Sequence, residues 1–161
     1  MFTDLYNTDI LSLSATLENT SLPSPSGTAR KVSKLCGSWV EIDLHLKPDS
    51  SLMRVDGKEI YVKDYYVFRS AFRVQACALG QASAAILKEN ILACDMSEII
   101  EARDALRAML KEGAEPPSGR FEKLALLAGV ANYPARHAST MLAFEAAVAA
   151  FENAGVKPYH F

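Results

Sequence analysis

The sequence has 161 residues, of which half are hydrophobic and 22% are charged. This composition is typical of a soluble globular protein, and the length suits a single domain, which we expect to span 1–161. The net charge of −2 gives no general attraction to nucleic acid or to anionic membranes, so both are excluded as partners.

The N-terminus and the cysteines bear on location. Acidic residues stand at Asp4 and Asp9, where a signal peptide needs basic ones, and no apolar run approaches the ~20 residues of a membrane span. We therefore predict a cytoplasmic protein. Three cysteines, an odd number for a reducing compartment, argue against a disulfide framework and leave metal binding, redox chemistry or burial.

The beginning of the chain predicts one helix and a connector. Apolar side chains at helical spacing predict a helix over 4–18. Two prolines and a glycine among serines make 21–27 a connector that forms neither helix nor central strand. The polar, basic stretch 28–34 that follows is assigned no element.

Three strands are predicted after this connector. Strict alternation of apolar and polar residues over 38–47 predicts a half-buried strand. Turns are predicted at 47–51 and at 55–58, where an Asp-Gly pair favours a tight hairpin. Two β-rich runs, 59–67 and 68–76, complete an antiparallel meander with one dry face and one wet face.

The second half of the chain predicts helices. An alanine-rich run predicts a helix over 78–93, and the capping box Asp95-Met96-Ser97-Glu98 opens another that Gly113 ends. A short helix is expected at 121–127, and a last helix over about 132–153. The fold class is therefore α+β, with helices covering one face of a three-stranded antiparallel sheet behind an N-terminal helix.

Cys77 carries the clearest chemical argument. It stands where a predicted strand gives way to a helix, and the unpaired N–H groups of a helix N-terminus favour an anion. A thiolate there could ligate a soft metal or attack sulfur. The alternative is a buried cysteine at a strand-to-helix junction, since cysteine is among the most buried residue types.

Cys36 stands at the other end of a predicted strand, so the two thiols can converge at one end of the sheet. Its neighbour Gly37 can let the backbone approach a bound ion closely. Cys94, just before the capping box, lies away from both turns and is interpreted as structural.

The turn at 133–139 is the expected third wall of this site. His137 could supply a nitrogen to a zinc or iron site, although isolated histidines are more often exposed or hydrogen-bonded. Arg136 could pair with a carboxylate or stabilise a thiolate, or it could simply be exposed. The sequence lacks a nucleophile elbow, a phosphate loop and a dinucleotide-binding glycine motif, so nucleotide-dependent chemistry is not expected.

Three segments together resemble a known family. They are Lys34-Leu35-Cys36-Gly37-Ser38, then Ala76-Cys77-Ala78-Leu79-Gly80-Gln81-Ala82-Ser83, then Leu127-Ala128-Gly129-Val130 through Tyr133-Pro134-Ala135-Arg136 to Phe144. In this order they resemble the scaffold family of iron–sulfur cluster assembly, which includes the NifU N-terminal, IscU and SufU proteins, and within it the SufU-like branch. The resemblance implies a SufE/NifU-like two-layer fold with a core at about 4–153.

The resemblance also implies a set of ligands. In that family the first turn reads Cys-Gly-Asp and the third reads Pro-x-Arg-x-x-Cys, and three cysteines with the aspartate hold a nascent cluster or a zinc ion. Cys36 and Cys77 match ligand cysteines, and Arg136 matches the family arginine. Ser38 stands at the aspartate position, and Ser139 at the third cysteine when the alignment has no gap. A shift of one or two residues would instead bring His137 toward the site.

The function implied is a scaffold-like protein, and not an enzyme, that binds iron, a nascent [2Fe-2S] cluster or zinc through Cys36 and Cys77. Its partners would be a cysteine desulfurase and proteins of cluster assembly or acceptance. Two thiolates are half of what a [2Fe-2S] cluster needs, so a homodimer could complete the set. The alternatives are an adaptor that binds a desulfurase or carrier without holding a cluster, and a sulfur acceptor that takes a persulfide on Cys77 or Cys36.

Overall fold

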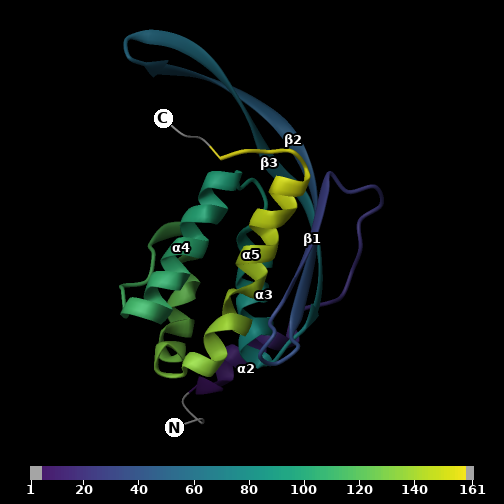
Figure 1. The fold of residues 1–161 in the computed structure, drawn as a ribbon, viewed down its shortest axis with the longest axis vertical. Helices are drawn as coiled ribbons and strands as arrows, with labels where there is room; N and C mark the ends of the chain where they lie inside the picture. Colours follow the sequence, from purple (N-terminus) through teal and green to yellow (C-terminus); the bar gives the residue numbers. More distant parts are fainter. Residues whose placement is uncertain (1–4, 159–161) are drawn as a thin grey trace.

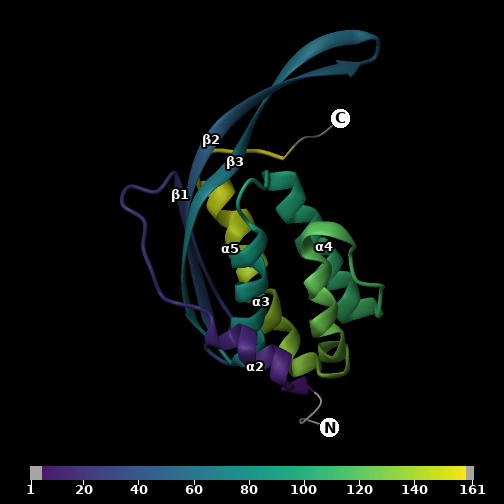
Figure 2. The same cartoon turned by 180° about the vertical axis from the view of Figure 1, so that it is seen from behind.

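The structure, a computed structural model, describes residues 5–158 except the side chains of Met53 and Val62. It has an α+β fold in which helices cover one face of a three-stranded antiparallel sheet of order β1-β2-β3 (Figures 1 and 2). This confirms the predicted fold class. The elements are α2 (Thr8–Ala15), β1 (Gly27–Val32), β2 (Trp39–Val55), β3 (Lys58–Gln75), α3 (Ala78–Asn90), α4 (Met96–Glu112), the 3-10 segments η1 (Gly119–Asn132) and η2 (Pro134–Arg136), and α5 (His137–Asn153).

The core lies between β2 and the two helices that contact the sheet. Val40, Ile42 and Leu44 alternate along β2 and are fully buried, as the 38–47 pattern predicts. Helix α5 packs against β1 and β2 and is itself buried over most of its length, while α3 packs against α5 and β3. A helix that is apolar on nearly all sides is one that other elements surround.

Strand β1 was not predicted, because its inward residues are small. Gly27 and Ala29 are buried there, and a Cβ added to Gly27 would collide with the carbonyl oxygen of Ala150 on α5. The close approach of α5 therefore demands glycine and alanine where a strand ordinarily shows large apolar side chains. The usual alternating signal is absent for this reason.

Strands β2 and β3 are longer than predicted. They pair without interruption from Trp39↔Gln75 to Val55↔Lys58, apart from one register shift at His45/Leu46. The predicted turn at 47–51 and the predicted break between 67 and 68 are therefore wrong. Pro48 is tolerated because β1 pairs with β2 only as far as Leu44, which leaves the rest of β2 as an edge strand.

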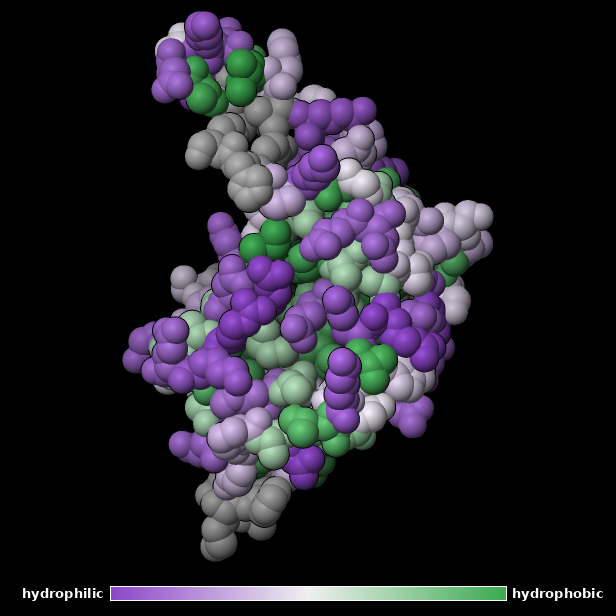
Figure 3. Space-filling view, in the orientation of Figure 1, coloured by the Kyte–Doolittle hydropathy of each residue, from purple (hydrophilic) through white to green (hydrophobic). Residues whose placement is uncertain are grey.

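The outer parts of β2 and β3 form a two-stranded ribbon, residues 47–66, that curves away from the body (Figures 1 and 2). Its tip is the predicted 55–58 turn, where Asp56 and Gly57 have φ angles of 51° and 77°. Leu52, Ile60 and Tyr61 are exposed on it. The space-filling view shows hydrophobic residues beside hydrophilic ones at the tip of the ribbon (Figure 3).

The outer face of the sheet is partly covered by segment 16–26, so the predicted wet face is not wet throughout. Asp43 is only 4% exposed, and it accepts hydrogen bonds from the Leu22 N–H at 3.0 Å and from both terminal nitrogens of Arg73. Arg73 also donates to the Thr20 carbonyl oxygen at 2.7 Å. This ion pair fastens segment 16–26 to β2 and β3.

The helical half largely follows the prediction. The capping box of Asp95 and Glu98 opens α4, and Gly113, with a φ of 66°, ends it. The short helix expected at 121–127 is part of the longer η1, and the last predicted helix begins as the short η2 before α5. The predicted N-terminal helix is confirmed as α2, although residue 4 lies outside the described residues. None of the described helices is long and apolar enough to cross a bilayer.

Candidate functional site

Cys36 lies in the loop that joins β1 to β2, residues 33–38. The Ser33 N–H donates to the Ser38 carbonyl oxygen and the Gly37 N–H donates to the Ser33 carbonyl oxygen, both at 2.8 Å. Gly37 has a φ of 71°, a conformation that glycine adopts without strain. The loop is therefore a closed turn that holds Cys36 exposed at its tip.

The surroundings of Cys36 favour its ionised form. The neutral Cys36 thiol donates to the Ser38 hydroxyl over 3.1 Å, and in the ionised form the same hydroxyl can donate to the thiolate instead. The hydroxyl of Ser33 is buried without a hydrogen-bond partner of normal length, but it lies near enough to help stabilise a thiolate. Hydrogen bonding from Ser33 and then from Ser38, with a smaller contribution from the charge of Arg136, lowers the pKa of the Cys36 thiol to about 7.

Cys77 is the N-cap residue of α3, as the sequence predicts. Its backbone has the extended conformation of a cap, with φ −65° and ψ 170°, but its side chain makes no capping hydrogen bond. The half-buried thiol points instead to α5, where Sγ lies 3.5 Å from Ser139 Oγ. The Cys77 thiol therefore makes no hydrogen bond to the backbone of α3 and stays available for other contacts.

Gly80 explains how α5 comes so close to Cys77. A Cβ added to Gly80 would lie 3.0 Å from the Ser139 carbonyl oxygen and 2.8 Å from the Ala76 Cβ. One turn along, the buried Ser83 hydroxyl donates to the Thr140 carbonyl oxygen at 2.7 Å. The absence of a side chain at Gly80 and the hydrogen bond from Ser83 together hold the first turns of α3 and α5 against each other.

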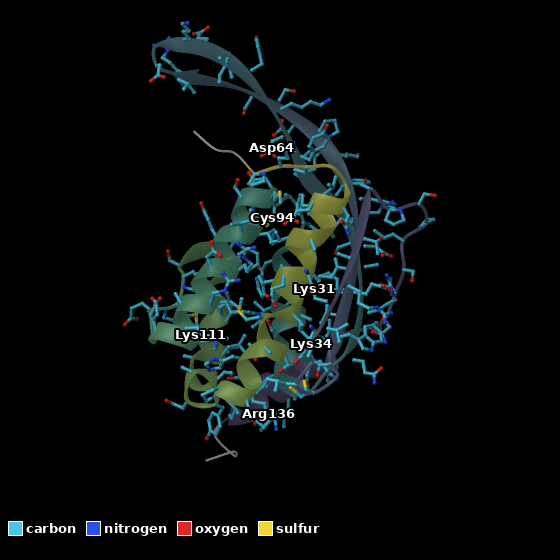
Figure 4. All side chains as sticks on the ribbon, in the orientation of Figure 1. Lys31, Lys34, Asp64, Cys94, Lys111 and Arg136 are labelled. Carbon is cyan, nitrogen blue, oxygen red and sulfur yellow. The ribbon has the colours of Figure 1, made fainter. Side chains whose placement is uncertain are left out.

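Segment 136–139 contacts Cys77 and carries a positive charge close enough to act on Cys36. The charge of Arg136 acts on Cys36, and the hydroxyl of Ser139 contacts Cys77 and also donates to the Arg136 carbonyl oxygen at 3.3 Å. The three predicted turns thus come together at one end of the body. Figure 4 shows Arg136 and Lys34 at this end, opposite the ribbon.

His137 does not join the two thiols. It is 6% exposed, and its Nε2 lies 3.0 Å from the Val130 carbonyl oxygen and 3.2 Å from that of Ala131. Carbonyl oxygens only accept hydrogen bonds, so Nε2 carries the proton. The ring is thereby tied to η1, and Ser139 is the residue that meets Cys77. The shifted alignment that would bring His137 to the site does not describe this structure.

The site therefore offers two sulfur atoms and few other ligands. No group of three His, Cys, Asp or Glu side chains able to hold a metal ion occurs in residues 5–158 as described. Cys94 does not contribute, because it is buried, its thiol donates to the Asn90 carbonyl oxygen at 3.2 Å, and burial raises its pKa to about 12. This agrees with the interpretation of Cys94 as structural.

Ser33 was missed by the sequence reasoning. It belongs to the polar stretch 28–34, which shows no pattern that predicts an element. Only the turn geometry reveals that it supports Cys36, because the Ser33 backbone closes the loop from both sides. A serine three residues before a cysteine is too common to have served as a signal.

Comparisons with known proteins agree with this architecture. No protein-family model matches the sequence, and no curated protein does. The N-terminal structure of a nitrogen-fixing NifU-like protein from Brucella abortus is 36% identical, with a TM-score of 0.78, covering 94% of this chain and 95% of that one.

Two further crystal structures share the fold at lower identity. A hypothetical protein is 18% identical over 92% of this chain and 97% of its own, with a TM-score of 0.69. A candidate iron–sulfur cluster assembly scaffold protein for the SUF system, from Fervidobacterium islandicum, is 19% identical over 88% of this chain and 93% of its own, with a TM-score of 0.67. From the identity and coverage of the Brucella match, the chain belongs to the NifU-like N-terminal family, as the resemblance predicted.

Proposed function

We propose that this protein is a scaffold in iron–sulfur cluster assembly that receives iron or a nascent [2Fe-2S] cluster on Cys36 and Cys77, with zinc as another ion it could take, and that it is not an enzyme. The observation that carries the proposal is that the turns bearing the two thiols lie at the same end of the sheet, where Trp39 pairs with Gln75, and that segment 136–139 contacts Cys77 and brings the charge of Arg136 near Cys36. Membership of the NifU-like family supports it, as does the description of a structure with the same fold as a candidate cluster scaffold.

Two thiolates leave the cargo half-coordinated. Iron in such clusters is held by cysteine sulfur, and a [2Fe-2S] cluster ordinarily takes four cysteines. Ser38 and Ser139 stand beside the two thiols, but a serine hydroxyl remains protonated at neutral pH and is a poor ligand for a soft metal. The remaining ligands would come from a partner protein or from a second copy of the chain across a two-fold axis.

Anaerobic reconstitution with iron and sulfide tests the proposal. We expect the wild-type protein to bind both, as measured by metal analysis, acid-labile sulfide and absorption spectra. Cys36→Ala and Cys77→Ala should each lose them, while Cys94→Ala is the matched control that should keep them, because that thiol lies outside the site. A wild-type protein that takes up neither iron nor sulfide nor zinc would exclude the scaffold role.

A second candidate, a persulfide acceptor, is favoured by the exposure of Cys36 and its pKa of about 7. The Cys36 thiolate would attack the outer sulfur of a donor persulfide, forming a new S–S bond and releasing the donor cysteine as its thiolate. Mass spectrometry after incubation with a cysteine desulfurase and free cysteine would detect the added sulfur. Cys77→Ala should still be modified and Cys36→Ala should not.

A pull-down with the desulfurase separates these roles from that of an adaptor. An adaptor without cargo should bind the desulfurase equally well after substitution of both Cys36 and Cys77 by serine.

We further propose a cytoplasmic location, because all three cysteines are free thiols, which is usual in a reducing compartment.

A further inference from the structure

The outer edge of β3 is open along the ribbon. β3 is the last strand in the sheet order β1-β2-β3, and in the described part of the chain no strand pairs with this edge from Lys58 to Tyr65. The edge is covered only at the base of the ribbon, where Tyr66 forms a bridge with Asp95. An open edge presents unpaired N–H and C=O groups, to which another strand can bind.

The two edges of the ribbon differ in whether they permit pairing. The β2 edge contains Pro48, which has no N–H to donate, and proline is a common means of protecting an edge. β3 contains no proline. A two-stranded ribbon is only marginally stable in water, yet this one extends away from the body over residues 47–66 (Figures 1 and 2). A further strand on the β3 edge would stabilise it.

The sequence of the open edge is complementary to itself. It reads Lys58-Glu59-Ile60-Tyr61-Val62-Lys63-Asp64, so a lysine followed by an acidic residue stands at each end. When two copies run antiparallel about a two-fold axis at position 61, Lys58 faces Asp64 of the partner subunit, and Glu59 faces Lys63 of the partner subunit. Each of these pairs occurs twice by symmetry, and opposite charges directly across two strands stabilise the pairing.

Neighbouring registers lose this match. In an antiparallel pair related by a two-fold axis, opposite residues share a face of the sheet, so the axis passes through one residue position. With the axis at position 60, Lys58 faces position 62 and Glu59 faces Tyr61. With the axis at position 62, Lys58 faces Tyr66 and Glu59 faces Tyr65. Neither register sets opposite charges against each other, so the charges favour the axis at position 61.

The charges of the ribbon are suited to association between copies. Lys58 and Lys63 are exposed, and neither takes part in an ion pair within the described residues. Lysines on an edge ordinarily oppose pairing, but here each one would face a carboxylate. Residues 47–66 contain as many acidic as basic residues, so two ribbons do not repel each other.

Exposed apolar side chains lie where the axis would pass. Tyr61 is 82% exposed, and Leu52, which pairs with it across the ribbon, is 52% exposed. Because residues directly opposite each other lie on the same face, the pairing would set Tyr61 beside Tyr61 of the partner subunit, with Leu52 next to it in the same row. The contact would take these side chains out of water and form an aromatic pair.

We propose that the β3 edge of the ribbon, residues 58–64, pairs with the same edge of a second copy of this chain, so that both ribbons form one continuous sheet. This goes beyond the proposed function and does not depend on iron or sulfide. Asp64 lies on the ribbon, whereas Arg136 lies at the opposite end of the body (Figure 4). The dimer would therefore keep its two thiol sites apart, and the remaining ligands of a cluster would come from another protein.

Sedimentation equilibrium of single and mixed charge variants tests the pairing. Glu59→Lys and Lys63→Glu should each raise the dissociation constant of the dimer by about tenfold or more, because like charges then face each other twice. An equimolar mixture of the two variants should dimerise about as tightly as the wild type, since opposite charges face each other again. Lys111→Glu, with the same charge change on α4, is the matched control and should dimerise like the wild type.

Disulfide trapping tests the register, in a Cys36→Ala background that removes the exposed native thiol. With oxidised glutathione, Tyr61→Cys should form a disulfide between copies, because opposite Cα atoms of an antiparallel pair lie about 4.5–5.5 Å apart. Leu52→Cys, one strand farther from the axis, should not. A wild type that stays monomeric, including one whose edge binds a strand of a different protein, would overturn the proposal. So would single variants that dimerise like the wild type, a mixture that stays monomeric, or equal trapping at positions 52 and 61.

Discussion

Cys77 Sγ and Ser139 Oγ lie 3.5 Å apart, across the closest approach of α3 and α5. Cys36 has an equivalent neighbour in Ser38, whose hydroxyl oxygen accepts a hydrogen bond from the thiol, with Sγ and Oγ 3.1 Å apart. Each thiol of the site is therefore paired with a serine. The serines can support a thiolate by hydrogen bonding, but they add no soft ligand.

Ser139→Cys should supply a third sulfur ligand beside Cys77. We expect zinc binding to tighten by more than about tenfold, because each thiolate adds to the affinity of a zinc site. Competition against a chromogenic chelator measures it. Ser14→Cys, at a half-buried position of α2, adds a thiol elsewhere and is the control. If both variants bind zinc with the same affinity, Ser139 is not at a ligand position.

Gly80→Ala should destabilise the protein and disturb the site together. The new Cβ would press on the Ser139 carbonyl oxygen at 3.0 Å, which belongs to the backbone of α5 and cannot turn aside. Overpacking of this kind costs about 1–3 kcal/mol in the free energy of unfolding, which urea denaturation measures. Gly129→Ala is the control, since its nearest outside atom is 4.0 Å away. Equal stabilities would refute a tight contact between the two helices.

Alkylation of Cys36 should rise with pH around a midpoint of about 7, because only the thiolate reacts and the Ser33 and Ser38 hydroxyls stabilise it. Ser38→Ala should move the midpoint upward toward the ordinary thiol value of about 8.5. Peptide mass spectrometry follows each cysteine separately. Cys94 should stay unmodified in the folded protein, because it is buried and its pKa is raised to about 12. An ordinary midpoint for Cys36 in the wild type would contradict the role of the serines.

The ion pair of Asp43 and Arg73 should make the free energy of unfolding depend on pH in the acidic range. Arg73 holds the pKa of the Asp43 carboxyl below its usual range, despite burial. The ion pair therefore stabilises the fold fully above the unfolded-state pKa of about 3.9, and this stabilisation is lost as the pH falls through the lower pKa of the folded state. Asp43→Asn should lower the free energy of unfolding by about 1–3 kcal/mol at neutral pH, because the buried carboxylate that binds two nitrogens of Arg73 is lost while Glu41 still pairs with the half-buried guanidinium.

Urea unfolding at neutral and acidic pH measures this effect, and the loss on acidification should be smaller in Asp43→Asn than in the wild type. Asp104→Asn is the control, because Asp104 is 52% exposed in its pairs with Arg103 and Arg107. Its substitution should change stability by no more than about 0.5 kcal/mol. A wild-type and an Asp43→Asn protein with the same pH dependence would show that another group governs acid unfolding.

Local patterns predicted the helices and the buried face of β2 well. The capping box at Asp95, the stop at Gly113 and the N-cap position of Cys77 each depend on a few neighbouring residues. Patterns failed where a distant element set the requirement. Gly27 and Ala29 are small because α5 approaches them, and nothing in their own segment records the presence of that helix.

The ribbon and the covered outer face were missed for related reasons. Pro48 and the serines after it read as a turn, because the sequence does not reveal that β2 has no neighbour on that side beyond Leu44. The alternating pattern places Asp43 on the solvent-exposed face of the strand. It is buried because segment 16–26 and Arg73 cover it. For the site, the motifs indicated which turns meet, but the choice of Ser139 over His137 required the rotation of α5.

Serine stands at 38 and 139, where the resemblance implies an aspartate and a cysteine, and this alters the charge of a complex bound at the site. Two thiolates neutralise a single divalent cation, whereas three thiolates and a carboxylate would leave such a complex with a surplus of two negative charges. An ion held by Cys36 and Cys77 alone would thus form an uncharged complex. Fewer anionic groups would oppose dissociation of the ion, which suits transient binding more than permanent binding.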